Sequence, residues 1–131
     1  FQDNNLLSDF TTVENVLMPL VIRGENYKTS LNKAKKVLKD VNLIDRVNHF
    51  PNELSGGEQQ RVAIARSLIA ETDLILADEP TGALDTKTGD EIIEIFKELS
   101  ESGITVIIIT HDNAVAKKTS RIIEMKDGMV Q

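Results

Sequence analysis

The sequence predicts an α/β fold with parallel strands, and two features of its second half support this prediction. Residues 74–77 form a continuous apolar run and residues 104–109 a β-branched run, and both have the length and composition of buried strands. Between and before these runs, apolar residues recur at helical spacing. Because strands that alternate with helices form parallel βαβ units, we expect both strands to be covered on both faces and to end at one edge of a sheet.

The composition limits the class of protein. A chain of 131 residues with 40% hydrophobic content suffices for one domain with a modest aliphatic core. Its net charge of -6 argues against a nucleic-acid partner, which usually needs a basic face. Without cysteine it can form neither a disulfide nor a thiolate metal site, which fits a reducing cytoplasm. No apolar run approaches the roughly 20 residues of a membrane helix, so a membrane role requires a partner.

The first 53 residues predict a loop followed by a small helical layer. Residues 1–5 are polar and resemble a strand end that continues into a loop. Thr11 and Glu14 form a capping-box pattern at the start of a helix, which Pro19 should bend or end. A second amphipathic helix follows a break at residues 24–27, and its apolar face consists of Leu31, Ala34, Leu38 and Val41.

A candidate anion site opens the next segment. The residues Ser55, Gly56, Gly57 and Glu58 directly precede a helix that we expect over residues 59–70. Two glycines let backbone N–H groups approach a ligand, and a helix start adds unpaired donors and a positive dipole end. Phosphate fits such a site, although an isolated Ser-Gly-Gly more often only caps a helix.

Charged residues follow both apolar runs. Asp78 and Glu79 end the first run, and His111 comes just after the second. Asp78 could hold Mg²⁺ on the phosphates of a nucleotide, and Glu79, which points elsewhere in an extended backbone, could polarise water as a general base. The alternatives are a solvated acidic turn, a structural histidine, or a His–carboxylate metal site, for which local ligand spacing is missing.

The remaining elements are a helix, a short helix and a hairpin. Thr88 and Glu91 form a second capping-box pattern before an apolar helix face. A short helix is expected near residues 113–118. Asp127 and Gly128 then form the dipeptide that favours a type I′ turn between two short strands.

Together these motifs resemble the nucleotide-binding subunit of ATP-binding-cassette (ABC) transporters. Residues 54–58 (LSGGE) resemble the signature motif, residues 74–79 (LILADE) the Walker B strand with its catalytic glutamate, and residues 83–85 (ALD) the D-loop. His111 resembles the switch histidine, and Gln2 stands where the family has its Q-loop glutamine. The wider sequence is most similar to the group that releases lipoproteins and exports macrolides and peptide antibiotics.

The resemblance implies a partial P-loop NTPase (RecA-like) core joined to the ABC helical subdomain. Residues 1–10 would be the Q-loop stub, residues 11–53 the helical subdomain, and residues 54–131 the signature helix, part of the core and a C-terminal hairpin. The implied cofactors are ATP and Mg²⁺.

The resemblance also implies a role for each motif residue. Asp78 and Gln2 would contact Mg²⁺, Glu79 and His111 would be catalytic, and Gln2 and His111 would sense the γ-phosphate. The signature residues, Ser55, Gly56, Gly57 and Glu58, would bind ATP held by the opposite subunit of a head-to-tail dimer. Asp85 would bind nucleotide and communicate across that dimer.

The implied partners are a second ATP-binding subunit and a transmembrane permease, which would place the protein in the cytoplasm on the inner face of the membrane. The sequence departs from the family pattern because it contains no G-x-x-x-x-G-K-[ST] phosphate loop. We therefore expect these residues to be the later portion of the domain, to bind ATP weakly when alone, and to self-associate through exposed strand edges.

Other functions remain as alternatives. Chromosome-maintenance and DNA-repair ATPases share the signature and Walker B motifs, but long coiled-coil insertions normally precede their signature. Ribosome-associated members usually carry Asn-His where this chain has Gly82 and Ala83. A non-catalytic interaction fragment that docks on a membrane partner is a third possibility.

Overall fold

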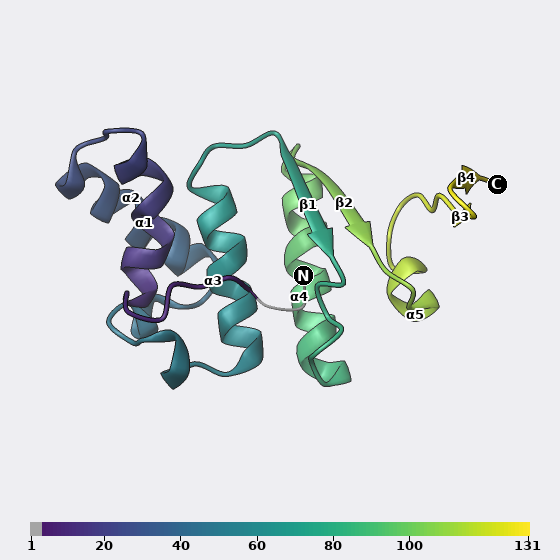
Figure 1. Ribbon diagram of the computed structural model, residues 1–131, viewed down its shortest axis with the longest axis horizontal. Coiled ribbons are helices and arrows are strands. Elements are labelled where there is room, and N and C mark those ends of the chain that lie inside the picture. Colours follow the sequence, from purple (N-terminus) through teal and green to yellow (C-terminus); the bar gives the residue numbers. More distant parts are fainter. Residues whose placement is uncertain (1–3) are drawn as a thin grey trace.

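Three α-helices precede the first strand, and strands and helices then alternate up to the C-terminal hairpin. The computed structural model describes residues 4–131. Figure 1 shows the first two helices at one end of the molecule, the strands beside a long helix in the middle, and a small hairpin at the other end. In order, the helices and strands are α1 (Thr12–Ile22), α2 (Tyr27–Asp40), α3 (Gly56–Leu68), β1 (Leu74–Asp78), α4 (Thr86–Glu101), β2 (Thr105–Ile109), α5 (Asn113–Ala116), β3 (Met125–Lys126) and β4 (Met129–Val130), with short 3-10 helices η1 (Ile44–Arg46) and η2 (Pro51–Glu53) between α2 and α3.

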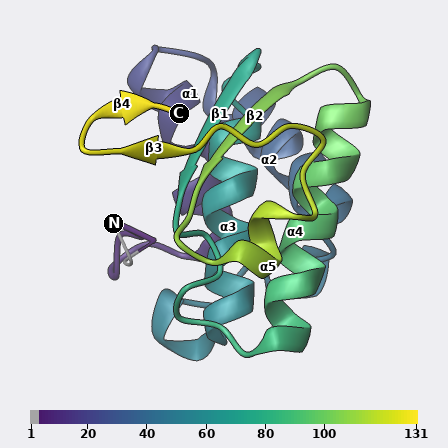
Figure 2. The same ribbon diagram turned by 90° about the vertical axis from the view of Figure 1, so that its right-hand side faces the viewer.

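The two longer strands form the predicted parallel pair. In their register, Leu74 lies beside Thr105 and Asp78 beside Ile109. Both strands therefore end at the same edge, and α4 provides the crossover between them (Figure 2). This βαβ unit confirms the expected α/β class.

The expectation that both strands are buried on both faces is wrong for this chain. Ile75 and Ala77 of β1 are buried in the core, whereas Leu76 is 66% exposed. Ile109 at the end of β2 is 56% exposed. Successive side chains of a strand point to opposite faces, and each face is buried only if another layer covers it. Residues 4–131 supply such a layer on one face, so the other presents Leu74, Leu76, Ile107 and Ile109 to solvent.

The helical layer begins with the predicted cap. The backbone N–H of Glu14 donates to the Thr11 hydroxyl (3.4 Å), and the Thr11 N–H donates to the Glu14 carboxylate (2.7 Å), which confirms the capping box. The helix α1 continues beyond Pro19 to Ile22, so the proline does not end it. Proline removes one backbone donor from a helix, but burial of Val16 and Leu20 on the same helix favours its continuation.

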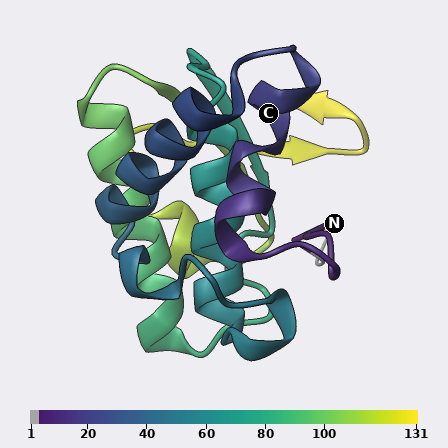
Figure 3. The ribbon, with the colours of Figure 1, turned by 90° about the vertical axis from the view of Figure 1, so that its left-hand side faces the viewer.

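One hydrophobic core joins the helical layer to the βαβ unit. It contains Leu20 of α1, Leu38 of α2, Val62 of α3 and Ile92 of α4, each at most 1% exposed. Figure 3 shows α1 and α2 lying beside α3, and Figure 1 shows that they are at the end of the molecule away from the hairpin. None of the helices formed by residues 4–131 combines the length and apolar character needed to cross a membrane.

Two helices begin earlier than the sequence pattern suggested. The helix α3 begins at Gly56, because Ser55 is its N-cap. The helix α4 begins at Thr86 with Asp85 as its N-cap, so the predicted capping box of Thr88 and Glu91 is wrong. Asp85 has the extended backbone that an N-cap needs, and its carboxylate accepts the Thr88 N–H at 3.2 Å.

The C-terminal hairpin has the predicted turn. Asp127 (φ 51°) and Gly128 (φ 77°) both have the positive φ that a type I′ turn requires. The strands β3 and β4 pair with each other in a sheet separate from β1 and β2. Figures 1 and 2 show this hairpin projecting from the rest of the chain.

Candidate functional site

A left-handed backbone turn follows the end of β1. Asp78 is the last residue of the strand, and Glu79 has φ 46°. The extended backbone that we expected at Glu79 is therefore wrong. Its N–H donates to the carbonyl of Ile109 at 2.8 Å, which holds the turn against the end of β2. A non-glycine residue with this φ is uncommon and often marks a functional position.

This turn brings Glu79 to His111. The carboxylate oxygen Oε1 of Glu79 accepts the backbone N–H of His111 at 2.8 Å and lies 2.6 Å from the ring nitrogen Nδ1. The other oxygen, Oε2, accepts the Thr110 hydroxyl at 3.1 Å. Burial by itself would raise the pKa of Glu79, but the hydrogen bonds from His111 and Thr110 outweigh it and lower the pKa overall. An ionised, oriented carboxylate is suited to accept a proton from water.

Asp78 lines a cavity of about 640 Å³ between α3 and β1, and Gly56, Glu79 and Leu84 also line it. A carboxylate is the ligand type that Mg²⁺ prefers, and one can suffice because Mg²⁺ keeps several of its own waters. Asp78 therefore fits a magnesium anchor. Within residues 4–131, no group of three or more His, Cys, Asp or Glu side chains could hold a metal on its own.

The signature turn, which we define as residues 54–58, is built as a helix cap. The Ser55 hydroxyl accepts the Glu58 N–H at 3.2 Å, and the Ser55 N–H donates to the Glu58 carboxylate at 2.8 Å. Gly56 is exposed, while Gly57 is buried. The capping alternative raised by the sequence thus describes the local structure, and the phosphate-binding role of these residues stays a prediction.

Glu58 also connects the signature turn to the helical layer. Its oxygen Oε1 accepts a hydrogen bond from Nε of Arg46 in η1 at 3.0 Å. The Ser55 N–H bond and the Arg46 pairing together lower the pKa of Glu58. The sequence pattern did not single out Arg46, because no local spacing signals a contact between separate elements.

The D-loop, residues 83–85, lies directly against the signature turn. A Cβ atom added at Gly56 would lie 3.2 Å from Cδ2 of Leu84. Asp85 accepts hydrogen bonds from the Thr88 hydroxyl (2.6 Å) and the Thr88 N–H (3.2 Å), of which the hydroxyl does most to lower the pKa of Asp85.

Gln2 lies outside the described residues, but the loop that follows it is held at two points. The first is Asn15, which is buried in α1. Its Oδ1 accepts the Leu7 N–H at 2.8 Å, and its Nδ2 donates to the carbonyls of Leu7, Phe10 and Thr11 at 3.0, 3.0 and 3.1 Å. The only sequence signal for Asn15 was that a polar residue stands beside Val16, an apolar position of the predicted helix.

The second point is Arg66 of α3. Its guanidinium donates to the carbonyls of Asn5 (2.8 Å) and Asn4 (2.9 Å). Burial lowers the pKa of Arg66, but an arginine stays charged. The loop is therefore attached to both α1 and α3.

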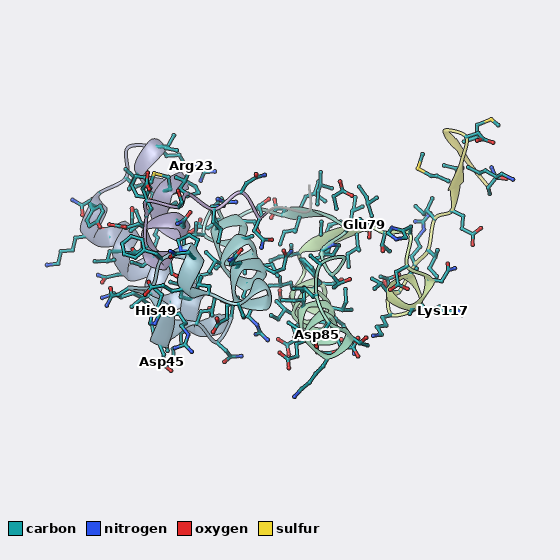
Figure 4. All side chains as sticks on the ribbon, turned by 60° about the horizontal axis from the view of Figure 1, so that its bottom comes forward. Arg23, Asp45, His49, Glu79, Asp85 and Lys117 are labelled. Atoms are coloured by element: carbon teal, nitrogen blue, oxygen red, sulfur yellow. The ribbon has the colours of Figure 1, made fainter. Side chains whose placement is uncertain are left out.

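Figure 4 shows how these parts are distributed. Glu79 and Asp85 lie in the part of the molecule formed by the strands and α4, whereas Arg23, Asp45 and His49 lie on the helical layer. His49, for which the sequence suggested no role, accepts the Thr12 N–H and hydroxyl through its backbone carbonyl.

Known proteins are similar in sequence to this chain. The sequence profile described as ABC transporter matches residues 1–82. The ATP-binding protein LolD of the lipoprotein-releasing system from Syntrophus aciditrophicus is 50% identical over 131 residues, which cover 99% of this chain and 59% of LolD. The macrolide export ATP-binding/permease protein MacB from Campylobacter jejuni is 50% identical over 99% of this chain and 20% of MacB. The chain thus spans about three fifths of the first relative and one fifth of the second.

Solved structures share the fold. The dimeric post-hydrolysis structure of the ATP-binding cassette MJ0796, bound to ADP and Pi, matches with a TM-score of 0.83 and 46% identity. The match covers 100% of this chain and 59% of that one. A putative metal-chelate type ABC transporter in an inward-facing conformation matches with a TM-score of 0.85 and 26% identity, over 93% of this chain and 51% of that one.

Proposed function

This chain belongs to the ABC transporter family, and we propose that it forms part of an ATP-binding subunit that hydrolyses ATP to power export or extraction of a substrate at the membrane. The observation that carries the proposal is the Glu79 carboxylate, which His111 and Thr110 hold in its ionised form at the edge of the sheet. Relatives at 50% identity named for lipoprotein release and macrolide export support the transport direction.

Each site residue has a distinct role in this proposal. Glu79 accepts the proton of the attacking water, and His111 orients Glu79 and senses the γ-phosphate. Asp78 holds Mg²⁺, with Gln2 as a further contact. When bound, magnesium ATP supplies the phosphoryl group that water attacks.

The subunit acts with partners in this proposal. Ser55, Gly56, Gly57 and Glu58 contact ATP held by a second ATP-binding subunit in a head-to-tail dimer, and Asp85 communicates between the two subunits. The dimeric MJ0796 structure supports this arrangement. The helical layer binds a transmembrane permease, which places the subunit on the inner face of the membrane. MacB, named as an ATP-binding and permease protein, supports such a coupling.

Replacement of Glu79 by glutamine tests the catalytic role. In an ATP-binding subunit that contains these residues and a phosphate loop, Glu79→Gln should slow hydrolysis by roughly 10²-fold or more, because general-base contributions have this size. ATP affinity should change little, since the base acts in the transition state. The exposed Glu98 on α4 provides a matched control, Glu98→Gln, which should leave both quantities unchanged. Equal losses of binding and hydrolysis in Glu79→Gln would indicate a structural role instead.

A polypeptide of these 131 residues should bind ATP weakly and hydrolyse it negligibly. The sequence contains no G-x-x-x-x-G-K-[ST], the motif whose backbone N–H groups surround the phosphates. Calorimetry that detects micromolar affinity for magnesium ATP would contradict this expectation.

The same polypeptide should self-associate through the uncovered sheet face. Leu76 and Ile109, which are 66% and 56% exposed, lie on this face of a sheet whose outer edges pair with no further strand among residues 4–131. Sedimentation should show an average mass that rises with concentration, and Leu76→Lys should reduce that rise. A monomer at all concentrations would contradict self-association.

A further inference from the structure

We propose that Thr88 is a positioning residue that links the signature turn to the D-loop within one chain. The methyl group of Thr88 occupies the space beside Gly57, and its hydroxyl is bonded to Asp85. The functional meaning of the two loops rests on the proposed function, but the contact between them does not.

Position 57 has no room for a side chain while Thr88 keeps its present rotamer. A Cβ atom at this position would lie 2.3 Å from Cγ2 of Thr88. Carbon atoms in van der Waals contact are about 3.5–4.0 Å apart, so an alanine side chain and the Thr88 methyl cannot both keep these positions. Gly57 lies in the first turn of α3, where any residue can adopt the backbone, so its conformation does not require glycine.

The hydroxyl of Thr88 holds the D-loop. It donates to Oδ1 of Asp85 at 2.6 Å, while the Thr88 N–H donates to Oδ2 at 3.2 Å. Both branches of threonine sit on Cβ, so one torsion, χ1, moves them together. A rotation that takes the methyl away from residue 57 therefore also takes the hydroxyl away from Asp85.

The two contacts form a mechanical connection. A change in spacing at the signature turn alters the Thr88 rotamer and, through it, the hydrogen bond to Asp85. In the proposed function, the signature turn contacts a nucleotide on the second subunit and Asp85 communicates between subunits. Thr88 would then transmit a change in the position of a subunit's signature turn to the D-loop of the same subunit.

Gly56 provides a control in the same helical turn. A Cβ atom there would lie 3.2 Å from Cδ2 of Leu84, the end of a longer side chain that can move by a few tenths of an ångström. Alanine should therefore be tolerated better at position 56 than at position 57.

A double-mutant cycle on the 131-residue chain, in urea and without nucleotide, tests the link. Gly57→Ala should lower the folding equilibrium constant on the order of tenfold, the usual cost of overpacking. Thr88→Ser removes the methyl and keeps the hydroxyl, so it should cost little. The combined variant, Gly57→Ala with Thr88→Ser, should fold about as well as Thr88→Ser alone, while Gly56→Ala should cost less than Gly57→Ala.

Carbon-13 NMR can measure the pKa of the Asp85 carboxyl, which would stay unchanged in Gly57→Ala if Thr88 had only a packing role. In Gly57→Ala, the pKa of Asp85 should rise toward its ordinary value, because the Thr88 hydroxyl has turned away. In the combined variant the pKa should be low again, as in the wild type.

Additive losses in the cycle, or an Asp85 titration that is the same in Gly57→Ala and the wild type, would overturn the proposal. If Gly57→Ala does not fold, the combined variant decides: a folded protein supports the link and an unfolded one overturns it. Because nucleotide takes no part in this cycle, its failure is distinguishable from a failure of the ATPase proposal, which the Glu79→Gln kinetics test separately.

Discussion

Replacement of Asn15 by alanine should destabilise the protein by about 2 kcal/mol. The side chain is 1% exposed and makes four hydrogen bonds to the loop that follows Gln2 and to the start of α1. Alanine keeps the helix and removes all four bonds. The loop would then lose its attachment to α1.

The magnitude depends on which backbone groups lose their partner. The Thr11 carbonyl still accepts the backbone N–H of residue 15, and the Leu7 carbonyl still accepts the Phe10 N–H. The Leu7 N–H and the Phe10 carbonyl lose the bond that Asn15 gave them. Leu7 and Phe10 are 44% and 40% exposed, so water can reach this loop. The loss of each of these two hydrogen bonds should therefore lower the unfolding free energy by about 1 kcal/mol. This is nearer the net contribution of a hydrogen bond than the full penalty of leaving a buried group without a partner.

Urea denaturation measures this change. With a slope of about 2 kcal/mol per molar urea, the midpoint should fall by about 1 M. Asn32→Ala, at an exposed position on α2, is the matched control and should leave the midpoint nearly unchanged.

Asn15→Asp distinguishes the contribution of the donating amide group of Asn15 from that of its accepting oxygen. It keeps the oxygen that accepts the Leu7 N–H but replaces the amide donor by an anion that faces three carbonyls. At neutral pH it should therefore be less stable than Asn15→Ala. A midpoint for Asn15→Ala within about 0.3 M of the wild type would refute the reasoning, because at the same slope that shift is under 1 kcal/mol.

Two further predictions concern the contacts of α3. Because the pKa of Glu58 is lowered, its interactions with Ser55 and Arg46 stabilise the fold above pH 4.5, the ordinary pKa of a glutamate, and this stability is lost as the pH falls below that value. In urea melts at several pH values, Glu58→Gln should therefore reduce the loss of unfolding free energy on the acid side. An unchanged dependence of stability on pH would contradict this. The Arg61 side chain is only 15% exposed and donates both to the carboxylate of Glu91 (2.8 Å) and to a backbone carbonyl. In the same assay, Arg61→Ala should lower the unfolding free energy by about 1–2 kcal/mol, and Glu91→Ala, which removes the more exposed partner, by less than about 1 kcal/mol. The reverse order would show that the carboxylate contributes most of the interaction.

Local sequence alone determined the features whose interacting groups lie within a few residues of each other. Thr11 and Glu14 cap α1 as expected, and Asp127 and Gly128 turn the hairpin, because these contacts close within a single turn of backbone. The apolar runs likewise predicted β1 and β2. Two runs of strand-forming residues with helical periodicity between them indicate a βαβ unit.

Only the tertiary structure decided which groups meet across elements. The left-handed turn at Glu79 is held by β2, the Arg46 contact joins η1 to Glu58, and the clash that keeps Gly57 free of a side chain comes from Thr88 in another helix. The exposed face of β1 has the same origin. A strand pattern states that a side chain is apolar, but whether that side chain is buried depends on which layer of the fold lies over it.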